Sequence, residues 1–185
     1  RRRSARVLAE AADVIVGSAL TPVAIAIAGV AADAQTPQLA VSPAALPPGK
    51  DTWTFRLPQS TAVMANALIG HMKKQGIKTL GFLGYNDAYG ESWLNDFKAE
   101  SEKLGGPKLV AVERFARADT SVTAQALKLT SQNPQAILVV ASGSGAAMPH
   151  KALIERGFKG KIYQTHGAAT RDLMRVGGKD VEGSY

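Results

Sequence analysis

Short apolar runs alternate with helical stretches along nearly the whole chain, and this alternation limits the possible folds more than any other feature of the sequence. Several runs, such as residues 136–141, are continuously apolar, as strands covered by helices on both faces must be. Strands that alternate with helices of this length form parallel βαβ units. The sequence therefore predicts an α/β fold of parallel sheets flanked by helices. Strands are expected at residues 14–16, 38–41, 79–83, 109–115, 136–141 and 161–164, and helices at 4–12, 22–34, 60–75, 90–104, 121–132, 146–156 and 169–176.

One proline-rich loop, over residues 43–51, interrupts the alternation, and the segment 53–57 after it is extended in character. We read this break as a crossing between two lobes. We expect a partial first lobe over residues 1–52, a crossing over 53–59, a second lobe over 60–180 and the start of a return strand over 181–185. The first part is too small to be an independent domain and the last strand is incomplete, so we expect the chain to be a piece of a longer protein.

The composition is that of an ordinary folded domain, with 45% hydrophobic and 20% charged residues. No apolar run approaches the length of a membrane span, and an export signal would have to lie outside this chain. The absence of Cys excludes disulfides and Cys-ligated zinc, and it is compatible with an oxidising compartment. The net charge of +7 comes from scattered Lys and Arg. Because the basic cluster at residues 1–3 has no interleaved aromatic residues, we expect no nucleic-acid partner.

Candidate ligand contacts follow the strands, because open α/β sheets bind ligands at the carboxyl ends of their strands. These segments carry mainly glycines and small hydroxyl residues just before helix N-termini, whose free N–H groups suit a carboxylate. Ser18 and Thr21 could equally be helix caps, Tyr89 could be packing, and His166 could be an ordinary loop residue. The segments considered are residues 17–22, 42–45, 84–90, 142–145 and 165–167.

Catalytic motifs are poorly matched. Residues 143–148 nearly form a dinucleotide fingerprint, but Met148 replaces the third glycine and Tyr163 stands where an acidic residue would hold the ribose. The chain has no P-loop and no Gly-x-Ser-x-Gly elbow, and its three histidines lack metal-ligand spacing. His71 and His150 fall on expected helices, where we interpret them as solvated. We therefore expect no enzyme, no cofactor and no metal site.

Several segments, taken in order, resemble one known family. They are Val14-Ile-Val-Gly-Ser-Ala-Leu-Thr-Pro-Val-Ala24, Pro37-Gln-Leu-Ala-Val-Ser-Pro-Ala-Ala45, Asn86-Asp-Ala-Tyr-Gly-Glu91, Asp119-Thr-Ser-Val-Thr123, Ala152-Leu-Ile-Glu-Arg-Gly-Phe-Lys-Gly160 and Gly177-Gly-Lys-Asp-Val-Glu-Gly183. Each motif is weak alone, but the ordered set is similar to type I periplasmic solute-binding proteins of the branched-chain amino-acid class. That resemblance implies two lobes, a ligand bound in the cleft between them and hinge closure around it.

The resemblance also implies a role for each candidate residue. Its ligand carboxylate would be held by Ser18 and Thr21, with small side chains beside it and an aromatic lid residue in the Tyr-Gly turn. Ser142 stands where amino-acid binders often have an aromatic residue, and His166 where they have an acidic partner for the α-ammonium group. These two departures favour an acid without an α-ammonium group, such as an aromatic or keto acid. The small side chains are Ala44 and Ala45, and the lid residue is Tyr89.

The function that the resemblance implies is solute binding for an ABC importer in the periplasm, with an amino acid or a related organic or aromatic acid as ligand and permease subunits as partners. A fragment of such a protein could also self-associate. A ligand-sensing domain of a receptor or regulator has the same fold and is the alternative. An α/β enzyme is a third reading, for which only Tyr89 and His166 could supply a catalytic group, and fold alone does not separate the three.

Overall fold

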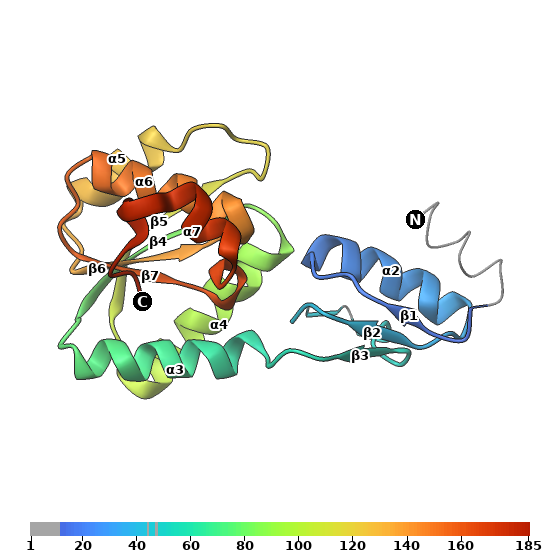
Figure 1. Cartoon of the computed structure of the whole chain (residues 1–185). Helices are drawn as coiled ribbons and strands as arrows, with labels where there is room; N and C mark the ends of the chain where they lie inside the picture. Colours follow the sequence, from blue (N-terminus) through green and yellow to red (C-terminus); the bar gives the residue numbers. More distant parts are fainter. Residues whose placement is uncertain (1–11, 44, 47) are drawn as a thin grey trace. The chain divides into compact units, whose positions relative to one another are not determined.

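The computed structural model describes residues 12–43, 45–46 and 48–185 (Figure 1). Contacts divide the chain into two compact units, Arg1–Met64 and Ala65–Tyr185. The helix expected over residues 4–12 falls outside the described residues but for its last position, and so does the candidate Ala44. The lobe boundaries expected at residues 52, 59 and 180 stay predictions.

Unit 1 contains a three-stranded parallel sheet with one helix packed on it (Figure 1). The strands β1 (Ile15–Val16), β2 (Gln38–Ala40) and β3 (Thr54–Arg56) lie in this order, and the helix is α2 (Thr21–Asp33). Ala24 of the helix and Ala40 of β2 are fully buried against each other. Between them, the buried Gln38 amide donates to two backbone carbonyls, at 2.9 and 3.2 Å, and accepts from the Thr54 hydroxyl at 3.0 Å. A buried polar side chain with this many partners fixes the register of the three strands.

The other face of this sheet is open within the described residues. Val16, Leu39 and Phe55 are aligned across the three strands, and Val16 and Phe55 are 70% and 56% exposed. The continuously apolar runs that were expected to lie under helices on both faces belong to unit 2, so this open face does not contradict that expectation. Because α2 is the helix that packs here, it covers one face and leaves the apolar row on the other.

Unit 2 is a four-stranded parallel sheet with helices on both faces (Figure 1). The strand order is β5-β4-β6-β7, and β6 at the centre is buried along its whole length. Figure 1 shows α3 and α4 on one face and α5, α6 and α7 on the other. This confirms the predicted α/β class with parallel sheets flanked by helices. The strands are β4 (Thr79–Tyr85), β5 (Lys108–Phe115), β6 (Ala136–Val140) and β7 (Lys161–Gln164), and the helices are α3 (Thr61–Lys74), α4 (Ala88–Leu104), α5 (Thr123–Ser131), α6 (Ala147–Glu155) and α7 (Arg171–Gly177).

Short 3-10 segments precede α6 and α7, and another follows α7. They were not predicted from the sequence as elements distinct from the α-helices. They are η1 (Gly143–Ala146), η2 (His166–Ala168) and η3 (Gly178–Val181). At the end of the chain, Tyr185 makes two backbone hydrogen bonds with β7: its N–H donates to the Ile162 carbonyl at 3.1 Å, and its carbonyl accepts from the Gln164 N–H at 2.7 Å. Tyr185 therefore lies along the free edge of β7, with its ring stacked on Tyr163.

The interpretation of His71 and His150 as solvated is wrong for His150. His150 is 1% exposed, because its side of α6 faces the sheet and η3, and its Nδ1 lies 3.2 Å from the Gln164 amide nitrogen. His71 is half-buried and its Nδ1 lies 3.1 Å from the Tyr163 hydroxyl. A position on a helix was not sufficient to predict exposure, since both helices bury one side.

Acid pH is expected to destabilise unit 2 through His150. Burial lowers the pKa of His150, against a smaller opposing effect of Asp180. Well above the unfolded-state pKa of about 6.5, His150 is neutral in both states, and its titration does not reduce the free energy of unfolding. Below that pH, the unfolded chain binds the proton more readily than the folded protein does, so protonation favours unfolding. We expect the free energy of unfolding to fall between about pH 7.5 and about pH 5.5, and to fall by less in His150→Gln. Urea titrations of both proteins at the two pH values test this, and equal falls would contradict it.

Candidate ligand-binding site

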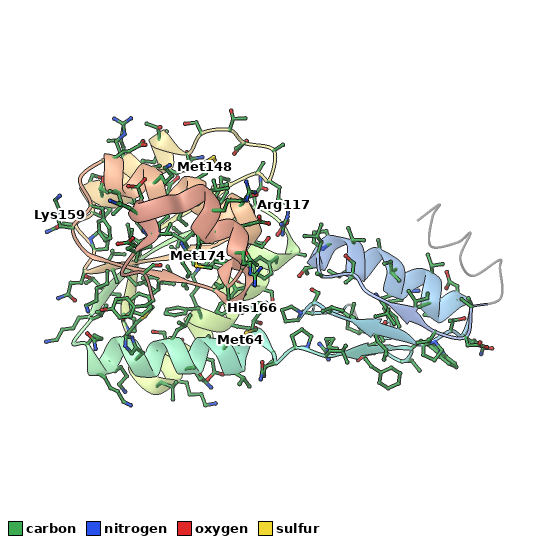
Figure 2. All side chains as sticks on the ribbon, viewed as in Figure 1. Met64, Arg117, Met148, Lys159, His166 and Met174 are labelled. Atoms are coloured by element: carbon green, nitrogen blue, oxygen red, sulfur yellow. The ribbon has the colours of Figure 1, made fainter. Side chains whose placement is uncertain are left out.

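The loops that follow the strands of unit 2 gather at one edge of its sheet. Since all four strands are parallel, their carboxyl ends point the same way. Figure 2 shows Arg117 and His166, which follow β5 and β7, on one flank of the unit, and Lys159, which precedes β7, on the opposite flank. This edge therefore brings together the candidates from the second half of the chain, and it is where sheets of this kind bind ligands.

Tyr89 lies in the first turn of α4 and is 5% exposed. Its hydroxyl lies 2.8 Å from the Thr165 hydroxyl, which also lies 3.4 Å from the Ala141 carbonyl. Burial raises the pKa of Tyr89 to about 12, although the hydrogen bond with Thr165 opposes the shift. The phenol is therefore protonated near neutral pH, where it can donate a hydrogen bond but cannot act as a base.

A glycine is required at position 167, where η2 packs against Tyr89 and the segment after β6. A Cβ at position 167 would lie 2.8 Å from the Tyr89 hydroxyl oxygen, 2.9 Å from the Ala141 carbonyl oxygen and 3.1 Å from the Ser142 Cβ. Tyr89 lies at the start of α4, and Ala141 and Ser142 follow β6, so any larger residue would push η2 away from α4 and from the segment after β6. The glycine that follows His166 is thus what lets the three loops meet.

His166 packs against two aromatic rings of α4. Its ring is edge-on to Tyr89, with centroids 5.9 Å apart, and stacked on Trp93, with centroids 6.0 Å apart. The residue stays exposed overall, but partial burial lowers the pKa of its imidazole. Near neutral pH the ring is therefore uncharged, and it offers one N–H donor and one nitrogen acceptor.

Arg117, two residues beyond β5, ties three loops together and was not among the predicted site residues. Its Nε donates to Asp87 Oδ2 at 2.6 Å, and its Nη1 donates to Ser142 Oγ at 3.2 Å. The guanidinium carbon lies 4.0 Å from the centre of the Tyr85 ring, a cation–π contact. The sequence signal for Arg117 is its place just after the carboxyl end of β5, since strand ends in such sheets carry ligand contacts.

Asp87 holds Arg117 and caps α4 at the same time. Its Oδ1 accepts from the backbone N–H groups of Tyr89 and Gly90, at 2.9 and 3.2 Å, while Oδ2 accepts from Arg117. Both carboxylate oxygens therefore already have partners inside unit 2. The two side chains are 19% and 31% exposed, so the pair is partly shielded from solvent and is more firmly fixed than a surface ion pair.

Unit 1 places its candidates after β1 and β2. Ser18 Oγ accepts from the Leu20 N–H at 3.1 Å, just before the first residue of α2, as a local turn residue does. The buried Thr21 hydroxyl lies 2.7 Å from the buried hydroxyl of Ser42, which was not among the predicted site residues. One of these two hydroxyls donates to the other, so one O–H of the pair remains for another acceptor. Ala45 is exposed.

Neither a metal-binding cluster nor a membrane-spanning helix occurs in the part of the chain that the structure describes. Residues 12–43, 45–46 and 48–185 contain no group of three or more His, Asp or Glu side chains that could hold a metal ion. Within the same ranges, no helix has the length and apolar character needed to cross a membrane.

A family model described as periplasmic binding protein matches residues 3–185, which is nearly the whole chain. The chain belongs to the periplasmic binding protein family. Binding proteins of this family have the fold described above, and the predicted resemblance is confirmed at this level. The family and the similar structures are described as binding proteins. A search of curated proteins gave no match.

Three solved structures illustrate what this periplasmic binding protein is similar to. An extracellular ligand-binding receptor from Rhodopseudomonas palustris is 49% identical with a TM-score of 0.95, and the match covers 99% of this chain and 51% of the receptor. A leucine-binding protein from Thermotoga maritima is 25% identical with a TM-score of 0.84, over 99% of this chain and 54% of that one. An ABC-transporter solute-binding protein from R. palustris in complex with benzoate is 19% identical with a TM-score of 0.82, over 99% and 51%, a likeness of fold alone. The chain spans about half the length of these structures.

Proposed function

We propose that this periplasmic binding protein is the solute-binding component of an ABC importer and that it binds a small ligand bearing a carboxylate. The observation that carries the proposal is the carboxyl edge of unit 2. There a fixed guanidinium, a serine hydroxyl and an uncharged imidazole lie on adjoining loops. These groups donate hydrogen bonds to an anion, and the protonated Tyr89 phenol beside them supports binding rather than proton transfer.

The ligand that we propose is an organic acid without an α-ammonium group, in the range of aromatic and keto acids. An ammonium group is commonly paired with a carboxylate, and at this edge the Asp87 carboxylate is already paired with Arg117 and bonded to two backbone N–H groups of α4. His166, which stands where the resemblance has an acidic residue, is neutral and has no negative charge to offer. A protein of the same fold was solved with benzoate, so this fold accommodates an aromatic acid.

The residues proposed to contact the ligand are those at the carboxyl ends of the strands in each unit. In unit 2 they are Tyr89, Ser142 and His166. In unit 1 the hydroxyl and backbone N–H groups of Ser18 and Thr21 are the proposed hydrogen-bond donors to the carboxylate, and Ala44 and Ala45 are proposed to lie beside it.

The proposed setting is the periplasm or cell exterior, with the subunits of an ABC permease as partners. The family description and the naming of a similar structure as an extracellular receptor support this setting. A ligand-sensing domain of a receptor or regulator is the alternative, and the rest of the gene product would separate the two, because a sensor is joined to a membrane or DNA-binding segment.

A ligand screen tests the proposal. The melting temperature of the full gene product would be measured in the presence of one compound at a time: leucine, benzoate, 4-hydroxybenzoate, 4-methyl-2-oxopentanoate or succinate. The affinity for each compound that raises the melting temperature would then be measured by calorimetry. A ligand at a thousand times its Kd stabilises the protein by about 4 kcal/mol. We expect stabilisation by one or more acids without an ammonium group and little by leucine. Tight leucine binding would overturn the ligand class, and no shift with any compound would count against the solute-binding proposal.

A further inference from the structure

We infer that Arg117 is a specificity-determining residue that contacts the ligand's carboxylate from unit 2. The inference rests on the proposed function and adds to it a residue that the resemblance does not supply. It starts from the position of Arg117 at the carboxyl edge of the sheet, on the same flank as His166 (Figure 2).

The guanidinium is held in one orientation by contacts on three sides. Asp87 accepts from Nε, the Ser142 hydroxyl accepts from Nη1, and the Tyr85 ring lies under its face. The Tyr85 ring is itself 4% exposed and packs on Phe115, with centroids 4.9 Å apart. Because these contacts already restrict the side chain, binding an anion costs less conformational entropy than with a mobile surface arginine.

The side chain keeps donors for a ligand. A guanidinium has five N–H groups, and Asp87 and Ser142 engage one each. No acceptor for Nη2 is found among the described residues, and the side chain is 31% exposed. Two N–H groups on adjacent guanidinium nitrogens match the two oxygens of a carboxylate.

The positive charge of Arg117 favours binding of an anion at the carboxyl edge of the unit 2 sheet. An arginine is protonated at all physiological pH values, whereas the His166 ring, which faces the same edge, is neutral. The Asp87 carboxylate offsets part of the charge, so the attraction is expected to act at contact range through hydrogen bonds and to depend little on long-range steering.

Matched acids and amides test the inference. The pairs are benzoate and benzamide, 4-hydroxybenzoate and 4-hydroxybenzamide, and 4-methyl-2-oxopentanoate and its amide, with affinities measured by calorimetry on the full gene product. In Arg117→Gln we expect the affinity for each bound acid to fall about 10- to 100-fold while that for its amide changes little. Equal losses for acid and amide would overturn the inference, because Arg117 would then only position the loops.

Arg114→Gln is the matched control. Arg114 lies three residues earlier in the chain, is exposed and pairs with Glu91 of α4, much as Arg117 pairs with Asp87. Both substitutions remove one positive charge beside one acidic partner. We expect Arg114→Gln to leave the acid-to-amide ratio unchanged, and a change equal to that in Arg117→Gln would mean that the effect is one of net charge.

A second variant and a spectroscopic measurement cover the case in which Arg117→Gln does not fold. Arg117→Lys keeps the charge but loses the paired donors, and we expect an acid affinity between those of wild type and Arg117→Gln. In the wild type, the Nε–H signal of Arg117 should shift on adding the acid and stay in place on adding the amide. If the acid binds and this signal does not move, the inference is wrong; if no acid binds the wild type at all, the proposed function fails and the inference fails with it.

Discussion

Gly90→Ala is expected to destabilise unit 2 more than any other single-methyl change at its candidate site. A Cβ at position 90 would overlap the backbone carbonyl of Tyr85, so β4 and α4 would have to move apart. Backbone atoms cannot rotate away as a side chain can, and we expect a loss of about 3 kcal/mol. The measurement is urea denaturation followed by Trp93 fluorescence in a Trp53→Phe background, which leaves Trp93 as the one remaining tryptophan of the two in the chain.

Gly70→Ala serves as the control for that substitution. Gly70 lies inside α3, with a helical backbone and nothing within 4 Å of an added Cβ. The same methyl group should therefore raise helix stability by up to about 1 kcal/mol. A Gly90→Ala protein as stable as the Gly70→Ala protein would show that β4 and α4 do not approach each other as described.

Trp93→Ala is expected to cost about 4 kcal/mol of stability and to loosen the site. Trp93 is fully buried in α4 and stacks on His166, so truncation leaves a cavity directly beneath the imidazole. Burial is what lowers the pKa of His166, and a less buried ring should titrate at higher pH, closer to its ordinary value. Calorimetric unfolding gives the first effect, and a pH titration of the His166 ring signals by NMR gives the second.

Comparison of Trp93→Phe with Trp93→Ala distinguishes the contribution of the aromatic bulk from that of the indole N–H. Among the described residues the indole N–H makes no hydrogen bond of normal geometry and only a weaker interaction with the Tyr89 side chain, so its removal should cost little. We expect Trp93→Phe to lose less than half of what Trp93→Ala loses and to keep the lowered pKa of His166. Equal losses in the two variants would mean that the aromatic bulk does not support the site.

The elements of unit 2 were predictable from the sequence to within a few residues, because each apolar run is bounded by a polar or glycine residue. The strand Lys161–Gln164 was predicted with both ends correct. Helix starts were less predictable: the expected helix 146–156 begins only at Ala147, because Gly143–Ala146 forms a 3-10 turn with no hydrogen-bonded side-chain cap to mark the change. Local sequence does not distinguish a 3-10 start from an α start when no side chain holds it.

The residues around the candidate site were only half predictable. Tyr89 and His166 could be found because they follow strand ends, but their contact depends on Gly167 and Thr165, which became informative only once three loops were brought together. The burial of His150 likewise depends on packing against β7 and η3, which no local pattern encodes. Partners of this kind are far apart in the sequence and are set by tertiary packing.

The pairing of Asp87 with Arg117 gives this protein a short evolutionary route to a new specificity. The carboxylate has to stay, because it caps α4, whereas the guanidinium occupies its second oxygen and also contacts Ser142 and the Tyr85 ring. A single replacement of Arg117 by a small neutral residue would leave Oδ2 available at the same edge. The charge that a ligand meets there would change sign while the fold kept its helix cap, so descendants that accept amines could arise without rebuilding the scaffold.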